Sequence, residues 1–297
     1  MENTKALDSL PETLARPSQA DLVMLNRLVE QSGWNQTAHD WQVFETLGSI
    51  HVIRDAQNTI VSSGAVLPLD TTAAWISMIL VTPSRRGHGL GRAIFQRCLD
   101  EVQKTGRVAL LDATPAGEAL YSQYGFTSQW HLRRWHRSAR TPTAAAPDPG
   151  SMSAQDPAGS ALPEDNRQAI ATLAALDAKA LGITRDTFID KLAARPGSRL
   201  VRRADAMAIV RDGRFARHVG PLVSSSEAAA AALLYDICES ESAELLIDVP
   251  ESRQELHIQL EAMGFAPQRG FARMSLGEPA PVGLTAFIHA IAGPEYG

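Results

Sequence analysis

A loop in the first third of the chain carries the residue types that anion binding requires. An apolar run over residues 75–82 leads into three glycines and three arginines, and an amphipathic helical pattern follows directly. Glycines let backbone N–H groups approach a phosphate closely, and the first turn of a helix adds a partial positive charge. The residues concerned are Arg85, Arg86, Gly87, Gly89, Gly91 and Arg92. The loop therefore predicts a site for a ligand that carries a pyrophosphate.

The familiar nucleotide-binding motifs do not describe this loop. The Walker pattern needs a lysine followed by Ser or Thr after its last glycine, whereas Arg92 and Ala93 stand here. The Rossmann fingerprint needs G-x-G-x-x-G at the opening of a βαβ unit, but these glycines are spaced differently and follow several predicted strands. A flexible turn explains any single glycine, but it does not explain the whole combination between a strand and a helix.

Hydrophobic periodicity predicts the elements that position the loop. Two helices come first, one capped by Ser18 and one over residues 38–47, and strands over residues 49–54, 59–67 and 75–82 follow. After the loop we expect a helix, a strand, a short helix and a final strand. Their predicted ranges are about 93–102, 108–113, 117–124 and 127–135. This order indicates an α+β domain with a mixed, mostly antiparallel sheet flanked by helices.

Two motifs in this region resemble signatures of the GNAT acetyltransferase superfamily. The pattern Arg86-x-x-Gly89-x-Gly91, preceded by Leu-Val-Thr-Pro-Ser-Arg, resembles the loop with which that family binds the pyrophosphate of acyl-CoA. About 30 residues later, Ala-Leu-Tyr-Ser-Gln-Tyr-Gly-Phe over residues 119–126 resembles the family's second signature. The predicted element order over residues 19–137 also matches the GNAT fold. The resemblance implies acetyl-CoA as the acyl donor and no metal.

The resemblance also implies roles for individual residues. In GNAT proteins the strand before the loop splays from its neighbour, so the backbone of Ile79, Leu80 and Val81 is expected to hold the thioester. Tyr121 aligns with the tyrosine that protonates the leaving thiolate, although a packing role in the core is the alternative, and Tyr124 fits packing better. The loop residues implied in donor binding are Arg86, Gly87, His88, Gly89, Leu90, Gly91 and Arg92. For His88 we expect the backbone amide to bind while the ring faces solvent.

The sequence does not identify the base that takes a proton from the acceptor. Asp112 and Thr114 follow the strand after the loop helix, and His51 and Glu45 lie on earlier elements that could border the acceptor site. Each also has a structural explanation, since Asp112 could cap the short helix at Gly117 and Thr114 begins a turn. All four therefore stay open as candidates.

Composition divides the chain into two domains. Residues 1–18 are expected to be a flexible N-terminus, residues 19–137 the acyl-CoA-binding catalytic domain, and the Pro-, Ala-, Ser- and Gly-rich residues 138–162 a linker. Residues 163–297 repeat the element order of the first domain, which resembles a tandem GNAT subset with a degenerate second copy. The copy lacks the Arg-x-x-Gly-x-Gly loop and a counterpart of Tyr121, so we expect it to be non-catalytic and to shape the acceptor cleft or an interface. For Glu295, near the end of the copy, a surface position is expected, with a position at the active site as the alternative.

Bulk properties narrow the function class. The 297 residues are 44% hydrophobic and carry a net charge of -5, which predicts a folded protein without a basic surface for nucleic acid or membranes. The two cysteines lie far apart and indicate no zinc site or disulfide framework. No signal or membrane-spanning pattern is visible, so we expect a cytoplasmic protein, with a homodimer as one arrangement.

These observations predict an acetyl-CoA-dependent N-acetyltransferase. The acetyl group would move from the thioester to a primary amine by direct attack in a ternary complex, with a small-molecule amine as acceptor. A non-catalytic acyl-CoA-binding regulatory module and an O-acyltransferase remain as alternatives. Because an alkyl ammonium has a pKa near 10.4, the chemistry needs a proton acceptor as well as a proton donor for the thiolate.

Overall fold

The computed structural model describes residues 9–140, 164–277 and 282–297. Most of the expected linker, from residue 141 to 162, lies outside the described residues, as do the first eight residues. Of the N-terminus expected to be flexible, Glu12–Thr13 form strand β1, which pairs with β2. We refer to residues 9–140 as the first half and to residues 164–297 as the second half.

The first half begins with two helices whose starts are fixed by their own side chains. Ser18 and Thr37 each form a capping box with an aspartate three residues later, which satisfies backbone N–H groups at the helix starts. The elements are α1 (Gln19–Gln31), α2 (Ala38–Leu47), β2 (Ser49–Arg54), β3 (Ile60–Pro68), β4 (Ala73–Val81), η1 (Pro83–Arg85), α3 (Leu90–Lys104), β5 (Val108–Ala113), α4 (Pro115–Ser122) and β6 (Thr127–Arg137).

The second half repeats this order of helices and strands and adds a short helix and a short strand at its end. Its elements are α5 (Glu164–Leu181), α6 (Asp186–Ala194), β7 (Arg199–Arg203), β8 (Ala206–Arg211), β9 (Arg217–Val223), α7 (Glu227–Ser240), β10 (Leu245–Pro250), α8 (Gln254–Ala262), β11 (Ala266–Leu276), η2 (Thr285–Phe287) and β12 (Ile288–Ala290). The predicted α+β class and the tandem repeat are therefore confirmed.

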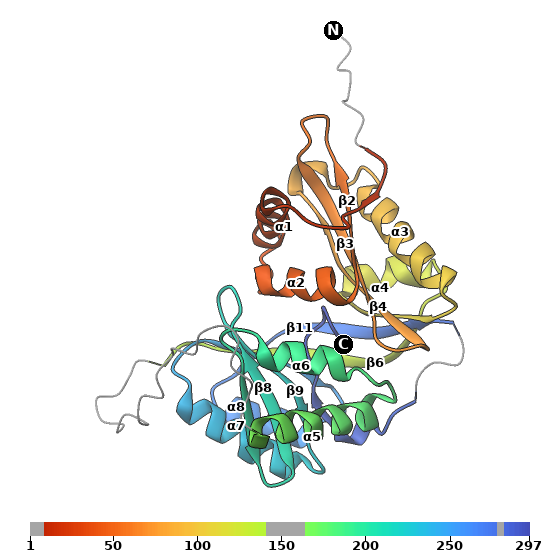
Figure 1. The fold of residues 1–297 in the computed structure, drawn as a ribbon. Coiled ribbons are helices and arrows are strands. Elements are labelled where there is room, and N and C mark those ends of the chain that lie inside the picture. Colours follow the sequence, from red (N-terminus) through yellow and green to blue (C-terminus); the bar gives the residue numbers. More distant parts are fainter. Residues whose placement is uncertain (1–8, 141–163, 278–281) are drawn as a thin grey trace.

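The two halves share one sheet because they exchange their long final strands. The sheet order is β1-β2-β3-β4-β5-β11-β6-β10-β9-β8-β7, so β11 of the second half lies beside β5 and β6 of the first half lies beside β10. Figure 1 shows β6 and β11 crossing the middle of the molecule between the two halves. Each half therefore places its final strand in the part of the shared sheet that the other half forms.

Two buried ion pairs bridge the exchanged strands at equivalent positions. Asp112 on β5 is the register partner of Arg273 on β11, and Asp248 on β10 is the register partner of Arg134 on β6. In both pairs the guanidinium donates two hydrogen bonds of 2.8 to 2.9 Å to the carboxylate. Planar, two-point contacts of this kind fix geometry as well as charge. The pairs thus tie the register of each exchanged strand to the opposite half.

The largest hydrophobic core lies between the halves. It joins residues of α1 and α2 with residues of α5 and α6, and it includes Trp41, Phe44, Trp75 and Tyr296. The opposite face of the first-half sheet packs against α3 through a second cluster that includes Phe95 and Phe126. The first-half sheet is therefore covered on both faces, and the second half supplies part of one cover.

Candidate active site

The loop expected to bind pyrophosphate joins η1 to α3. Gly87 and Gly89 have φ values of +78° and +83°, a region that side chains other than glycine rarely adopt, and Gly89 is the N-cap of α3. The first N–H groups of the helix, from Leu90 to Arg92, have no acceptor within it. Backbone donors and the helix dipole thus converge at the start of α3, as an anion site requires.

Side chains hold this loop against the end of β4. The Nε of Arg86 donates to the carbonyl oxygen of Val81 at 3.2 Å. His88 is exposed, and its Nδ1 lies 2.9 Å from the carbonyl oxygen of Arg86, so its ring folds back on the loop. Arg92 contacts Gln123 at 3.5 Å and thereby links α3 to the segment after α4.

Strands β4 and β5 separate directly before this loop. Their parallel pairing covers only Ala73–Trp75 of β4, which lie opposite residues 108–110 of β5. A bulge in the β3–β4 ladder follows, and Met78 there has a φ of +54°. Bulges bend a strand and increase its local twist. The edge of β4 beyond Trp75, which includes Ile79, Leu80 and Val81, therefore lacks a strand partner on the β5 side within the described structure.

A cavity of about 110 Å³ lies at this separation, and we call it the split cavity. Tyr121, Leu111 and Ile76 line it from the face that α3 covers, whereas Met78 and Phe271 belong to the core on the opposite face. Its lining residues are Trp34, Gln36, Ile76, Ser77, Met78, Ile79, Leu111, Asp112, Thr114, Tyr121, Arg134, Arg269, Phe271, Pro294 and Glu295. The cavity thus brings groups from both faces of the sheet to one place.

Tyr121 enters the split cavity from α4. Its ring packs against Phe95, with a centroid distance of 4.6 Å, and against Phe126. No other described residue forms a hydrogen bond with its hydroxyl group. Burial raises the pKa of Tyr121 above its usual value, so the phenol holds its proton at neutral pH. Tyr124 packs edge-on against the same Phe95 ring.

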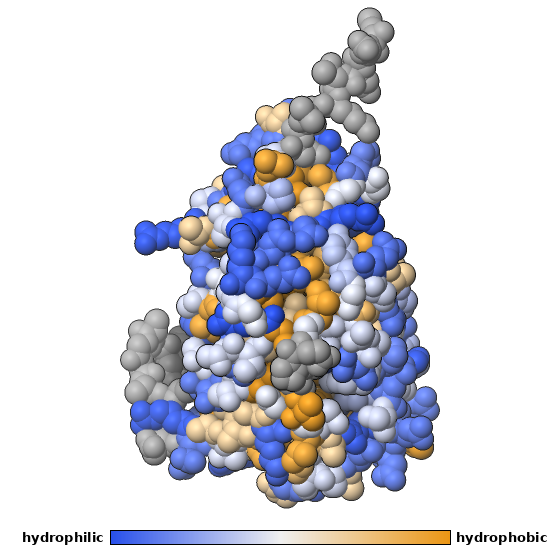
Figure 2. Space-filling model, turned by 90° about the vertical axis from the view of Figure 1, so that its right-hand side faces the viewer, coloured by the Kyte–Doolittle hydropathy of each residue, from blue (hydrophilic) through white to orange (hydrophobic). Residues whose placement is uncertain are grey.

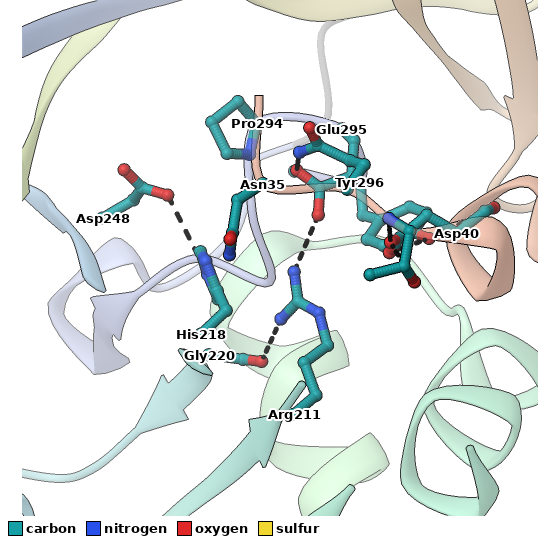
Figure 3. Close-up of polar contacts among 12 residues, drawn as sticks. Asn35, Asp40, Arg211, His218, Gly220, Asp248, Pro294, Glu295 and Tyr296 are labelled. Atoms are coloured by element: carbon teal, nitrogen blue, oxygen red, sulfur yellow. Dashed lines mark hydrogen bonds and ion pairs between the residues drawn. The ribbon is translucent and has the colours of Figure 1, made fainter. Parts of the chain in front are cut away.

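Glu295 reaches the split cavity from the opposite side. It is only 3% exposed, so the expected surface position is wrong. One carboxylate oxygen accepts a hydrogen bond of 2.7 Å from Arg211 on β8 (Figure 3). The other accepts one of 2.8 Å from the side chain of Gln36. Burial raises the pKa of Glu295, although the ion pair with Arg211 opposes this shift. The carboxylate is therefore held in place while it borders the cavity.

The residue after Glu295 fixes the tail in place. The ring of Tyr296 is fully buried and stacks on Phe44 at a centroid distance of 5.5 Å. Its hydroxyl group donates to Asp40 at 2.9 Å, and Asp40 also pairs with Arg195 of the second half. The tail after β12 is thus locked between α2 and the second half, which explains how Glu295 keeps its position.

The loop between α1 and α2 supplies the remaining wall of the cavity. The side chain of Asn35 donates to the carbonyl of Ala216 at 2.8 Å and accepts from two backbone N–H groups of the second half. Trp34 and Gln36, its neighbours in the chain, both line the split cavity. The second half therefore positions one wall of a cavity whose other wall belongs to the first half.

The structure separates the four candidates for the base. Asp112 and Thr114 line the split cavity, but Glu45 borders a different surface hollow. His51 is buried, pairs with Glu101 at 2.8 Å and does not line the cavity. The expected capping by Asp112 is wrong, because Thr114 caps α4 and Asp112 binds Arg273 with both oxygens. Burial is the main cause of a raised pKa for Asp112.

The corresponding separation in the second half is filled by the chain itself. Strand β9 pairs with β10 only over residues 217–219, and beyond that point β12 pairs with β9. The backbone N–H of Ile291, just after β12, donates to the carbonyl of Asp248 on β10 at 3.1 Å. At the start of α7, Ser226 caps the helix with its own side chain. The tail therefore occupies the place that stays open in the first half.

A second cavity, of about 210 Å³, lies beside the split cavity. Aromatic and aliphatic side chains line it, among them Trp75, Trp130 and Tyr296, and both of its arginines are bound to aspartates. Near its rim, Val282 and Leu284 are 90% and 53% exposed. Figure 2, which views the molecule from the right-hand side of Figure 1, shows a vertical band of hydrophobic residues on this face. The hydroxyl group of Tyr296 is engaged as well, because it donates to Asp40.

The described ranges hold neither a metal-binding cluster nor a membrane-spanning helix. No group of three or more His, Cys, Asp or Glu side chains there is placed to hold a metal ion. Within the same ranges, no helix has the length and the apolar character that crossing a membrane requires.

Comparison with known proteins agrees with this architecture. Two family models, both described as an acetyltransferase (GNAT) domain, match residues 47–128 and 173–284. The chain therefore belongs to the GNAT acetyltransferase superfamily and carries two GNAT domains in tandem. No curated protein matches it in sequence.

Solved structures share the fold at low sequence identity. A Pyrococcus horikoshii protein assigned as an acetyltransferase has a TM-score of 0.72 and 18% identity, covering 97% of this chain and 96% of its own. A GCN5-related N-acetyltransferase from Sphaerobacter thermophilus has a TM-score of 0.63 and 15% identity, with coverages of 93% and 99%. A tandem GNAT protein from the clavulanic acid biosynthesis pathway has a TM-score of 0.59 and 16% identity, with coverages of 90% and 98%. The predicted tandem GNAT fold is thus confirmed over nearly the whole chain.

Proposed function

We propose that the chain transfers an acetyl group from acetyl-CoA to a primary amine at the split cavity. The observation that carries this proposal is the composition of the cavity. The partly buried Tyr121 enters it from one face of the sheet, and the buried carboxylate of Glu295 borders it from the other. When an amine attacks a thioester, a base takes a proton from the amine and an acid gives a proton to the leaving thiolate. The two groups must lie on opposite sides of the reacting atoms.

The residues around the α3 loop fit the donor. The N–H groups at the start of α3, together with Arg86 and Arg92, suit a pyrophosphate, and the unpaired edge of β4 offers backbone groups to the acyl-pantetheine arm. Ser77 on that strand has a buried hydroxyl oxygen without a partner in the described residues, and it lines the cavity. Bound acetyl-CoA would supply the carbonyl carbon that the amine attacks.

Glu295 is the carboxylate best placed to accept the proton of the amine. Asp112 also lines the cavity, but both of its oxygens accept hydrogen bonds from Arg273. Glu295 shares one oxygen with Arg211 and the other with a neutral amide, and its raised pKa makes it a stronger base. The free oxygen of Gln36 would orient the amine, because it is buried and unpartnered within the described part of the chain.

Tyr121 would complete the reaction by donating its proton to the leaving thiolate. Its raised pKa keeps the phenol protonated until the thiolate forms beside it. The thiol that forms titrates near 8.5, so proton transfer from a phenol to the thiolate is uphill in water and depends on the position of the hydroxyl group. The surrounding aromatic rings of Phe95 and Phe126 provide that position.

The second half acts as a scaffold in this proposal. It delivers Glu295 and Phe271 to the cavity and holds the loop that carries Gln36. Its own strand separation is filled by β12, so we propose that it binds no donor.

An acetylation assay with a panel of primary amines tests the proposed function. Thiol release and N-acetyl product are measured together for the wild type and for Glu295→Gln. We expect product with at least one amine, and a turnover that falls about 100-fold in the variant, as is typical for loss of a general base. Acetyl-CoA affinity and unfolding temperature, measured in parallel, distinguish loss of the base from loss of the fold. Thiol release without N-acetyl product from any amine would contradict the proposal.

A further inference from the structure

The charges around the split cavity do not balance. Four charged residues line it, and three of these are neutralised by ion pairs: Asp112 with Arg273, Arg134 with Asp248, and Glu295 with Arg211. The fourth, Arg269 on β11, forms no hydrogen bond or ion pair with any described residue. With these three pairs counted as neutral, Arg269 is left as one unpaired positive charge at the cavity.

The environment of Arg269 makes this surplus costly. Its guanidinium lies over the ring of Phe271 at 5.2 Å, and the guanidinium of Arg134 lies over the same ring at 5.3 Å. Its Nε is buried and has no hydrogen-bond partner among the described residues. Burial, followed by the nearby charge of Arg134, lowers the pKa of Arg269. Arg269 is partly buried, and a guanidinium that is desolvated beside a second cation is stabilised by a bound anion. Among the described residues, no carboxylate forms a hydrogen bond or ion pair with it.

Two further orphaned atoms face the same space. The side-chain oxygen of Gln36 and the hydroxyl of Ser77 are buried without partners in the described ranges, and both residues line the split cavity. Each such group costs about 1–3 kcal/mol unless a ligand or water satisfies it. A fitting ligand would therefore offer a hydrogen-bond donor to the side-chain oxygen of Gln36 and an anionic hydrogen-bond acceptor to the guanidinium of Arg269.

We propose that the acceptor is an amino acid-like molecule, a primary amine that also carries a carboxylate, and that Arg269 binds this carboxylate. This inference rests on the proposed function, and it names the class of acceptor for the same site. The amine lies at the end of the cavity formed by Gln36 and Glu295, and the carboxylate pairs with the guanidinium of Arg269. A guanidinium binds a carboxylate through two parallel hydrogen bonds, so recognition there is directional as well as electrostatic.

The same arrangement discriminates against simple amines. An amine without a carboxylate leaves the partly buried guanidinium of Arg269 without an anionic partner. Sites built around a charged hydrogen bond reject ligands that lack the partner far more strongly than apolar sites reject a missing methylene group. Arg269 is thus a specificity-determining residue, and it takes no part in proton transfer.

The test compares acceptors that differ only in the carboxylate. Suitable pairs are alanine with ethylamine, 4-aminobutyrate with propylamine, and phenylalanine with phenethylamine. Acetylation is measured for the wild type, Arg269→Gln, Arg269→Lys and Arg133→Gln. The last is the matched control, since Arg133 lies on the neighbouring strand β6, pairs with Glu251 at the surface and does not line the split cavity.

We expect the wild type to prefer the carboxylated member of at least one pair. Arg269→Gln should raise the KM for that amino acid about 10- to 100-fold, the loss expected for a charged hydrogen bond, and leave the KM of its partner amine unchanged. Arg269→Lys should restore part of the affinity, and Arg133→Gln should match the wild type. Equal use of both members, or an equal effect of Arg269→Gln on both, would overturn the inference.

A binding experiment separates this inference from the proposed function. If no amine is acetylated, the proposed function fails, and the same amino acids are titrated calorimetrically into the protein saturated with acetyl-CoA. Binding that requires the carboxylate and is lost in Arg269→Gln would still support the anion site. Absence of binding, or binding that Arg269→Gln leaves unchanged, would overturn it.

Discussion

At the residue scale, the candidate site depends on a few side chains that the two halves hold in fixed positions. Tyr121 is held by a cluster of aromatic rings within the first half. Glu295 depends on Arg211 and Gln36, which come from opposite halves. The proposed proton donor is thus a local feature of one domain, whereas the positions of the proposed base and of the arginine proposed to bind a carboxylate depend on both halves together.

The role proposed for Tyr121 predicts a selective loss of turnover. Tyr121→Phe removes the proton donor but keeps the ring that packs on Phe95. We expect kcat to fall at least about ten-fold, because general acid catalysis typically contributes more than that. Acetyl-CoA affinity should change little. Steady-state kinetics and calorimetry check both, with Tyr124→Phe as the control on the same helix end, and an unchanged kcat in Tyr121→Phe would remove this residue from the mechanism.

Sequence reasoning located some of these residues and missed others for physical reasons. The α3 loop and Tyr121 belong to short motifs, so local spacing reveals them. Arg269 stands in a segment without a motif. The contact of Glu295 with Gln36 and the place of Arg269 in the split cavity both depend on residues far away in the chain. The sequence signal that was available for Arg269 is weak, namely an arginine two residues before a buried aromatic residue on one strand.

At the scale of elements, strand exchange determines the architecture. Periodicity predicted where helices and strands lie, because apolar spacing is a local property. It could not predict that β11 pairs with β5, since β6 and β11 have similar patterns and either strand satisfies the alternation that β5 requires. The choice is made by long-range partners such as the Asp112–Arg273 pair, which no local pattern encodes.

This pair should be sensitive to the loss of one partner. Arg273→Met keeps much of the side-chain volume between Trp75 and Trp130 but leaves Asp112 buried without its counter-charge. We expect the free energy of unfolding to fall by about 3–5 kcal/mol at pH 7.5, as is typical for a buried pair with one partner removed. Urea unfolding measures the change.

The surface pair on the neighbouring strand is the control for this change. Arg133→Met breaks the contact with Glu251, where both side chains are more than 40% exposed, and should cost less than about 1 kcal/mol. The pH dependence gives a second check. Burial already raises the pKa of Asp112, and in Arg273→Met it should rise further. Protonation then relieves the cost, so the difference from the wild type should shrink as pH falls towards 5. Equal losses in both variants would contradict this account.

At the scale of the whole molecule, the two GNAT domains form one body with different tasks. The first half keeps an open strand separation and the α3 loop, whereas the second half fills its own separation with β12. The tail that fills it continues to Glu295, so closure of one site and completion of the other use the same segment. The tandem arrangement therefore makes one composite site from two copies of the fold.

Strand exchange predicts that the halves stay together when the chain between them is cut. A protease recognition sequence inserted between residues 141 and 162 allows cleavage of the folded protein. We expect the two fragments to co-elute in gel filtration and to retain acetyl-CoA binding, because β6 and β11 each remain paired on both sides. Fragments that separate without denaturant would show that the exchanged strands do not hold the molecule together.

The central claim is that each chain has one acetyl-CoA site, at the α3 loop. A calorimetric titration with acetyl-CoA tests it most directly. It compares the wild type with Gly89→Glu and Gly264→Glu. Both glycines have a similar positive φ, +83° and +85°, and open space around them, so the two changes impose similar backbone strain. We predict one site in the wild type, loss of binding in Gly89→Glu and normal binding in Gly264→Glu. Two sites per chain, or full binding by Gly89→Glu, would contradict the account.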